Sequence, residues 1–134
     1  MIGIVVVTHG RLAEEFRKAL EHVVGTQDQF ETVCIESDDD MEAKRGEIAK
    51  SIKSAETGNG VIILTDLFGG TPSNMAISFM QEMNVEVIAG INLPMLVKLS
   101  SIRASGDLDS VATMAQEVGR KYIHVASKVL EGRE

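Results

Sequence analysis

Four short apolar runs stand out in the sequence, at residues 2–7, 32–35, 61–64 and 85–91. The first, third and fourth consist almost entirely of Val, Ile and Leu. Strands that are covered on both faces of a parallel sheet have this composition, whereas half-exposed strands alternate apolar and polar residues. We therefore predict four strands that belong to a mainly parallel sheet.

Segments with helical periodicity separate these runs. In residues 11–24, apolar residues spaced three and four apart form one stripe, and Gly25 then ends the helix. Further helices are predicted at residues 41–56, 72–83, 95–101 and 108–119, and a last apolar stretch covers residues 122–130.

Strands that alternate with helices form right-handed βαβ units, which build a parallel sheet. We expect an open α/β fold with the strand order 2-1-3-4 and helices on both faces. No linker, internal repeat or change in composition divides the chain, so residues 1–134 are predicted to form one domain. Sheets of this kind bind ligands beyond the carboxyl ends of their strands, where the strand order reverses.

Composition and charge narrow the possible functions. The formal net charge of −7 argues against a nucleic-acid-binding surface, and a single cysteine, Cys34, excludes an internal disulfide and a CxxC metal or redox site. No apolar run approaches the ~20 residues that span a bilayer, and no charged leader precedes the first run. We expect a cytoplasmic protein without a metal or cofactor, in which Asp38–Asp40 is a solvated loop that begins the second helix.

Two residues with reactive side chains follow the first and third predicted strands. His9 comes directly after the first strand, and Gly10 lets the backbone approach a bound group closely. Asp66 leaves the third strand within the segment TDLFGGTPSN. Because these strands are neighbours in the order 2-1-3-4, we expect His9 and Asp66 to face each other. A carboxylate that accepts the imidazole N–H fixes the tautomer and leaves the other nitrogen as a nucleophile.

The segment after Asp66 also offers donors for the oxygens of a phosphoryl group. Backbone N–H groups of Gly69, Gly70 and Thr71 lie at the start of a predicted helix, where anions are favoured, and the Thr71 hydroxyl adds a donor. Each feature has a plainer interpretation, since such a histidine is often structural, two glycines often form only a turn, and such an aspartate is often a helix cap. Their joint placement favours the chemical interpretation.

The surroundings of this centre are predicted from two segments. We place five residues at its rim: Phe68, Ser73, Asn74, Pro94 and Met95. The other candidate side chains are interpreted as structural: His22 lies in the first predicted helix, His124 in the last apolar stretch and Cys34 in a strand.

Three segments carry a resemblance to a known family: IVVVTHG at residues 4–10, TDLFGGTPSN at 65–74 and VIAGINLPML at 87–96. In order and spacing they resemble the IIA domain of the mannose family of the bacterial phosphoenolpyruvate-dependent sugar phosphotransferase system. The resemblance implies that His9 is the phosphorylated residue and Asp66 its carboxylate partner. It also implies a phosphoryl donor, the histidine phosphocarrier protein HPr.

The same resemblance implies further partners. A IIB domain or protein would accept the phosphoryl group and phosphorylate sugar during uptake through membrane IIC and IID proteins. Family members form homodimers in which a C-terminal strand crosses to the other subunit, and residues 122–130 are the candidate for that strand. Two other functions stay open: a regulatory IIA protein whose phosphorylation state controls a partner, and a flavodoxin-like domain that binds a small anion without a covalent step.

Overall fold

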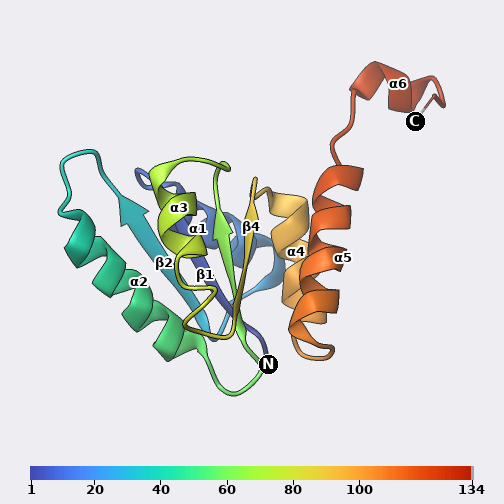
Figure 1. Cartoon of the computed structure of the whole chain (residues 1–134). Helices are drawn as coiled ribbons and strands as arrows, with labels where there is room; N and C mark the ends of the chain where they lie inside the picture. Colours follow the sequence, from blue (N-terminus) through green and yellow to red (C-terminus); the bar gives the residue numbers. More distant parts are fainter. Residues whose placement is uncertain (134) are drawn as a thin grey trace.

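The predicted sheet is present in the computed structural model, which describes residues 1–133. Its parallel strands lie in the order β2-β1-β3-β4, as predicted (Figure 1). The strands are β1 (Gly3–His9), β2 (Phe30–Ile35), β3 (Val61–Thr65) and β4 (Val85–Ala89). His9 is therefore the last residue of β1, and Asp66 comes directly after the neighbouring β3.

The helices are α1 (Leu12–Val24), α2 (Met41–Ala55), α3 (Thr71–Ile77), α4 (Leu93–Ile102), α5 (Leu108–Lys121) and α6 (Ala126–Leu130). The largest error in a predicted helix is at α3, which ends at Ile77 rather than at residue 83. There the Ser78 hydroxyl donates to the carbonyl of Met75, and the backbone continues as turns with i to i+3 hydrogen bonds. In contrast, α4 begins earlier than predicted because the Asn92 side chain accepts a hydrogen bond from the N–H of Met95.

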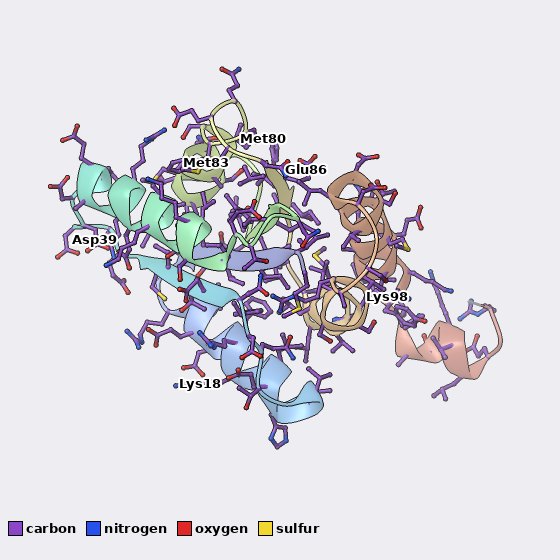
Figure 2. The ribbon with its side chains drawn as sticks, turned by 90° about the horizontal axis from the view of Figure 1, so that it is seen from below. Lys18, Asp39, Met80, Met83, Glu86 and Lys98 are labelled. Atoms are coloured by element: carbon purple, nitrogen blue, oxygen red, sulfur yellow. The ribbon has the colours of Figure 1, made fainter. Side chains whose placement is uncertain are left out.

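Successive side chains of the central strands enter two separate cores. Ile4 and Val6 pack on one face with α1, α4 and α5, whereas Val5 and Val7 pack on the other face with α2 and α3. Figure 2 shows α1 and α2 on opposite sides of the sheet, with Lys18 directed away from it. Both faces of the central strands are thus covered, which explains their continuous Val, Ile and Leu composition.

A buried arginine joins the segments that precede β1 and β2. The Arg103 side chain is 2% exposed, and its guanidinium donates to the carbonyls of Ile2, Asp28 and Gln29 and to the side chain of Gln27. Burial lowers the pKa of this guanidinium, while the carboxylate of Asp28 opposes the effect. Arg103 lies at the opposite end of the sheet from His9 and therefore has a structural role.

The C-terminal segment differs from the prediction of a strand. Residues 126–130 form the helix α6, none of whose residues is buried, and this segment projects away from the rest of the molecule (Figure 1). Within one chain the segment meets no strand edge, so its backbone forms local hydrogen bonds from Lys128 and Val129 to Val125 instead. None of the helices in residues 1–133 has the length and apolar character needed to cross a membrane.

Candidate functional site

His9 is positioned by the end of β1 and by the turn that follows. Its Cα pairs with Ile35 of β2. The backbone turns at Gly10, whose φ of +55° lies in the left-handed region that favours glycine. The buried Thr8 hydroxyl then accepts a hydrogen bond of 2.7 Å from the N–H of Ala13 and so caps the first turn of α1. These local contacts fix the backbone on both sides of the imidazole.

Asp66 binds both the ring and the backbone of His9. One carboxylate oxygen, Oδ2, lies 2.8 Å from His9 Nδ1 and 3.0 Å from the His9 backbone N. The other oxygen, Oδ1, accepts a hydrogen bond of 3.1 Å from the N–H of Leu67. The predicted juxtaposition of His9 and Asp66 is therefore confirmed.

The charge state of Asp66 determines which nitrogen of His9 is available. Burial raises the pKa of the Asp66 carboxyl, but the hydrogen bonds from the ring and backbone of His9 lower it more, so the pKa lies below its ordinary value. An ionised carboxylate only accepts hydrogen bonds, so Nδ1 carries the proton. In the neutral ring the lone pair is then on Nε2. The His9 side chain is 47% exposed, so this nucleophilic ring is open to a partner.

Gly70 lies directly against the imidazole. A Cβ at this position would be 2.9 Å from Cε1 and 3.3 Å from Nε2 of His9. The backbone of Gly70 is extended, with φ −83°, so its lack of a side chain matters for the close approach rather than for conformation. Gly69 before it has φ +91°, a conformation that favours glycine. The two predicted glycines thus have different roles, one in the turn and one in contact with the ring.

An open hollow lies beside the His9 ring. Thr71, the first residue of α3, contributes to its wall together with His9 and Gly10, as the sequence predicted. Besides Ile35, the last residue of β2, the hollow is lined by four residues that the sequence did not predict for the site: Glu36, Ser37, Asp39 and Met41. They follow β2, which is paired with β1, so the predicted strand order already implied their proximity. The hollow therefore has an acidic side that faces the histidine.

The acidic loop after β2 also begins a helix, as predicted. The side chain of Asp40 accepts hydrogen bonds from the N–H groups of Glu42 and Ala43 and caps α2. Asp39 is only partly exposed and binds the N–H of Glu36 and the ammonium of Lys44. Among residues 1–133 there is no group of three or more His, Cys, Asp or Glu side chains that could hold a metal ion.

The predicted rim residues are only partly brought together. Phe68 is 78% exposed in the loop that carries Asp66, and Asn74 is also exposed. Ser73 lies in the first turn of α3 but is fully buried, and its hydroxyl has no hydrogen-bond partner among the described residues. Pro94 and Met95 do not line the hollow at His9. Met95 is buried between β4 and α5, and Pro94 lies in a groove beside α1.

The other two histidines lie outside this site. His22 is exposed in the last turn of α1, and the His124 ring meets the Tyr122 ring edge to face with a centroid distance of 6.0 Å. His9 combines exposure with a carboxylate on one nitrogen and a glycine backbone beside the other. Such an arrangement can hold one tautomer and present the second nitrogen for nucleophilic attack.

The sequence of this chain is similar to those of known proteins. A family model described as "PTS system fructose IIA component" matches residues 3–116. The mannose-specific EIIAB component of Escherichia coli K12 is 32% identical over 124 residues, which are 91% of this chain and 38% of that protein. The fructose-specific EIIA component of Bacillus subtilis 168 is 25% identical over 132 residues, 98% of this chain and 90% of that protein.

Solved structures show the same likeness. The mannose/sorbose specific IIA subunit from Enterococcus faecalis superposes with a TM-score of 0.82 at 27% identity, covering 92% of this chain and 93% of that one. The EIIA component from Streptococcus agalactiae superposes with a TM-score of 0.86 at 23% identity, over 96% and 99% of the two chains. The chain thus spans 38% of the EIIAB proteins that it matches and most of the EIIA chains.

Proposed function

This chain belongs to the mannose and fructose type IIA family of the bacterial sugar phosphotransferase system, and we propose that it is a phosphohistidine carrier with His9 as the phosphorylated residue. The donor in this proposal is the phosphohistidine of HPr, and the acceptor is a IIB protein. Members of the family are phosphotransferase components, so the proposal assigns the residues and partners of a reaction for which the family is known.

The observation that carries the proposal is the 2.8 Å contact between His9 Nδ1 and Asp66. With the proton held on Nδ1, the Nε2 lone pair forms the new N–P bond while the N–P bond of phospho-HPr breaks. The HPr imidazole leaves with the electron pair of that bond. The His9 ring becomes an imidazolium, and the Asp66 carboxylate stabilises its positive charge.

The phosphoryl oxygens need donors on the Nε2 side of the ring. The Gly70 backbone lies on that side, and Thr71 follows it on the wall of the hollow. No side chain caps the start of α3 among the described residues, so the N–H groups there are open to an anion. We propose that these N–H groups and the Thr71 hydroxyl bind the phosphoryl oxygens, each charge-assisted hydrogen bond contributing about 1.5–3 kcal/mol.

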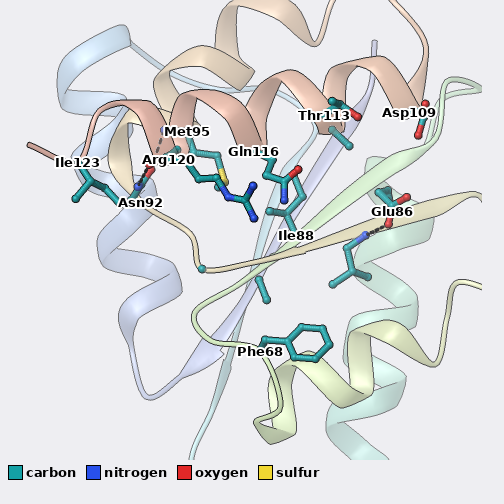
Figure 3. Close-up of a pocket in the computed structure, with 15 residues that line it drawn as sticks. Phe68, Glu86, Ile88, Asn92, Met95, Asp109, Thr113, Gln116, Arg120 and Ile123 are labelled. Atoms are coloured by element: carbon teal, nitrogen blue, oxygen red, sulfur yellow. Dashed lines mark hydrogen bonds between the residues drawn. The ribbon is translucent and has the colours of Figure 1, made fainter. Parts of the chain in front are cut away.

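We also propose that two copies of the chain form a dimer by exchange of their C-terminal segments. The strand β4 is an edge of the sheet, and residues 86–90 line a groove of about 450 Å³ together with one face of α5 (Figure 3). The segment after α5 exposes five large apolar side chains: Tyr122, Ile123, Val125, Val129 and Leu130. A strand added to β4 would cover both surfaces. Light scattering should give about twice the monomer mass, and a clean monomer at micromolar concentration would contradict the exchange.

Incubation with phosphoenolpyruvate, enzyme I and HPr tests the carrier proposal. The intact mass should increase by one phosphoryl group, the increase should be lost in acid, and a IIB protein added afterwards should take up the group. A domain that only binds anions gives no covalent mass increase, which would refute the carrier. A carrier that retains its group in the presence of IIB proteins would instead have the regulatory function.

A further inference from the structure

Residues of α1, α4 and α5 line a groove of about 760 Å³, which we call the α4 groove. The helix α4 buries Met95, Leu96 and Leu99 in the core, and its residues 94, 97, 98 and 101 form a stripe at helical spacing that lines the groove. The groove follows α4 from residue 93 to residue 101, ~12 Å at the rise of a helix. Six apolar side chains line it: Val23, Val24, Leu93, Pro94, Val97 and Val118. Sites of this size and apolar character bind small molecules, and the elongated shape fits an aliphatic chain.

The α4 groove differs in charge from the other hollows described above. The groove along β4 contains the carboxylates of Glu86 and Asp109, and the hollow beside the reactive imidazole contains those of Glu36 and Asp39. No acidic residue is among the described residues that line the α4 groove, although the full chain has 20 acidic side chains and a net charge of −7. Its charged lining residue is Lys98. Positive charge at one hollow of an acidic protein favours an anionic ligand there.

Two polar side chains of the α4 groove are open to such a ligand. Within residues 1–133, the Lys98 ammonium makes no ion pair and the Tyr122 hydroxyl makes no hydrogen bond. The hydroxyls of Ser100 and Ser101, by contrast, donate to carbonyls of α4, and the Gln27 side chain is also hydrogen-bonded. An ammonium only donates, and a phenol hydroxyl can donate. A ligand that satisfies both groups must therefore bring acceptor oxygens.

We propose that the α4 groove binds a free fatty acid of medium chain length, with its carboxylate at Lys98 and its aliphatic chain along the apolar walls. Lys98 is half-buried and extends from α4 away from the sheet (Figure 2), as a lysine does when its stem covers apolar surface and its ammonium reaches water. A membrane surface fits less well, because it attracts clusters of several cations. This site is separate from His9, and its ligand takes no part in phosphoryl transfer.

The single tyrosine of the chain reports on the groove, since the full sequence has one Tyr and no Trp. Titration with dodecanoate below its micelle concentration should change Tyr122 emission and release or absorb heat in calorimetry, both saturating at one ligand per chain. Dodecanol, which lacks the charge, should bind at least about tenfold more weakly, and acetate, which lacks the chain, should give no saturable change. Absence of both signals with dodecanoate, or equally tight binding of dodecanol, would overturn the proposal.

Three variants locate the site. Lys98→Met keeps the apolar stem and should weaken dodecanoate binding at least about tenfold, and Val23→Glu, at a wall position that is 57% exposed, should do the same by adding a carboxylate. Lys53→Met is the matched control, because this exposed lysine lies on α2 at the opposite face of the sheet, and its affinity should equal that of the wild type.

Two further results would overturn the inference. The first is wild-type affinity in Lys98→Met, or an equal loss in Lys53→Met. The second is sedimentation of the protein with phosphatidylglycerol vesicles without any binding of free dodecanoate. Neither result affects the mass increase that tests the carrier proposal.

Discussion

Replacing Asp66 by Asn keeps the shape of the side chain and removes one acceptor oxygen. Three donors converge on the carboxylate: His9 N–H, the ring Nδ1–H and Leu67 N–H, at 3.0, 2.8 and 3.1 Å. The amide has one oxygen, so its NH₂ group must face at least one of these donors. Either a hydrogen bond is lost, or the ring moves its proton to Nε2 and ceases to be a nucleophile there.

The magnitude of the effect is decided by hydrogen bonding, because the electrostatic contributions oppose each other. At an effective dielectric of 20, attraction between the carboxylate and a charged ring ~4 Å away is about 4 kcal/mol. Repulsion from a phosphoryl group ~6 Å away is about 3 kcal/mol per unit charge. Solvent reduces both, since the His9 side chain is 47% exposed. The remaining effect is the wrong tautomer of the His9 ring. We therefore expect phosphoryl gain from HPr to slow by about tenfold or more, which corresponds to ~1.4 kcal/mol of activation free energy.

Rapid-quench measurement of both half-reactions checks this prediction. We expect Asp66→Asn to fold, to gain the phosphoryl group more slowly and also to pass it on more slowly. Asp39→Asn is the matched control, because it removes a charge from the same hollow while Asp39 binds Glu36 and Lys44. If both rates of Asp66→Asn match those of the wild type, Asp66 is only structural and the mechanism proposed for His9 is wrong.

Three further predictions concern the support of the site and the sheet. Gly70→Ala should fold but lose at least about tenfold in phosphoryl gain, because its Cβ displaces the His9 ring from Asp66; an unchanged rate would contradict the close contact. The pKa of Asp66 is lowered in the folded protein, so its ionised carboxylate stabilises the fold fully above about pH 3.9, the ordinary pKa of Asp, and this stabilisation is lost as the pH falls through the folded pKa. The difference in unfolding free energy between the wild type and Asp66→Asn should therefore shrink in acid. Arg103→Met should cost about 3 kcal/mol or more in urea unfolding, whereas the exposed Lys53→Met should stay within ~0.5 kcal/mol; equal effects would refute the structural role of Arg103.

The strand order was predictable because strands that are buried on both faces need apolar side chains at successive positions, and such runs are visible in the sequence. Residues such as Val5 and Val6 face different cores, so neither position tolerates a polar side chain. The pairing of His9 with Asp66 then followed from the order of the strands alone. The early end of α3 was not visible in the sequence, because residues 78–83 keep apolar side chains at helical spacing while the backbone forms turns.

The rest of the site was harder to predict because it depends on the paths of loops and on how deeply each side chain is buried. Asp39 was interpreted only as part of a solvated loop, although the pairing of β1 with β2 places it beside His9. Pro94 and Met95 follow β4, yet α5 packs against that strand and Met95 turns into the core beneath it. The partners of a buried Arg103 lie 74 to 101 residues away in sequence, and no local pattern reveals such contacts.

Replacing each histidine in turn tests directly whether His9 is the phosphorylated residue. His9→Ala, His22→Ala and His124→Ala are incubated with enzyme I, HPr and labelled phosphoenolpyruvate, and each fold is checked by circular dichroism. We expect His9→Ala to remain folded and to take up no label, while the other two variants are labelled like the wild type. Label retained in His9→Ala, or lost in His22→Ala or His124→Ala instead, would contradict it.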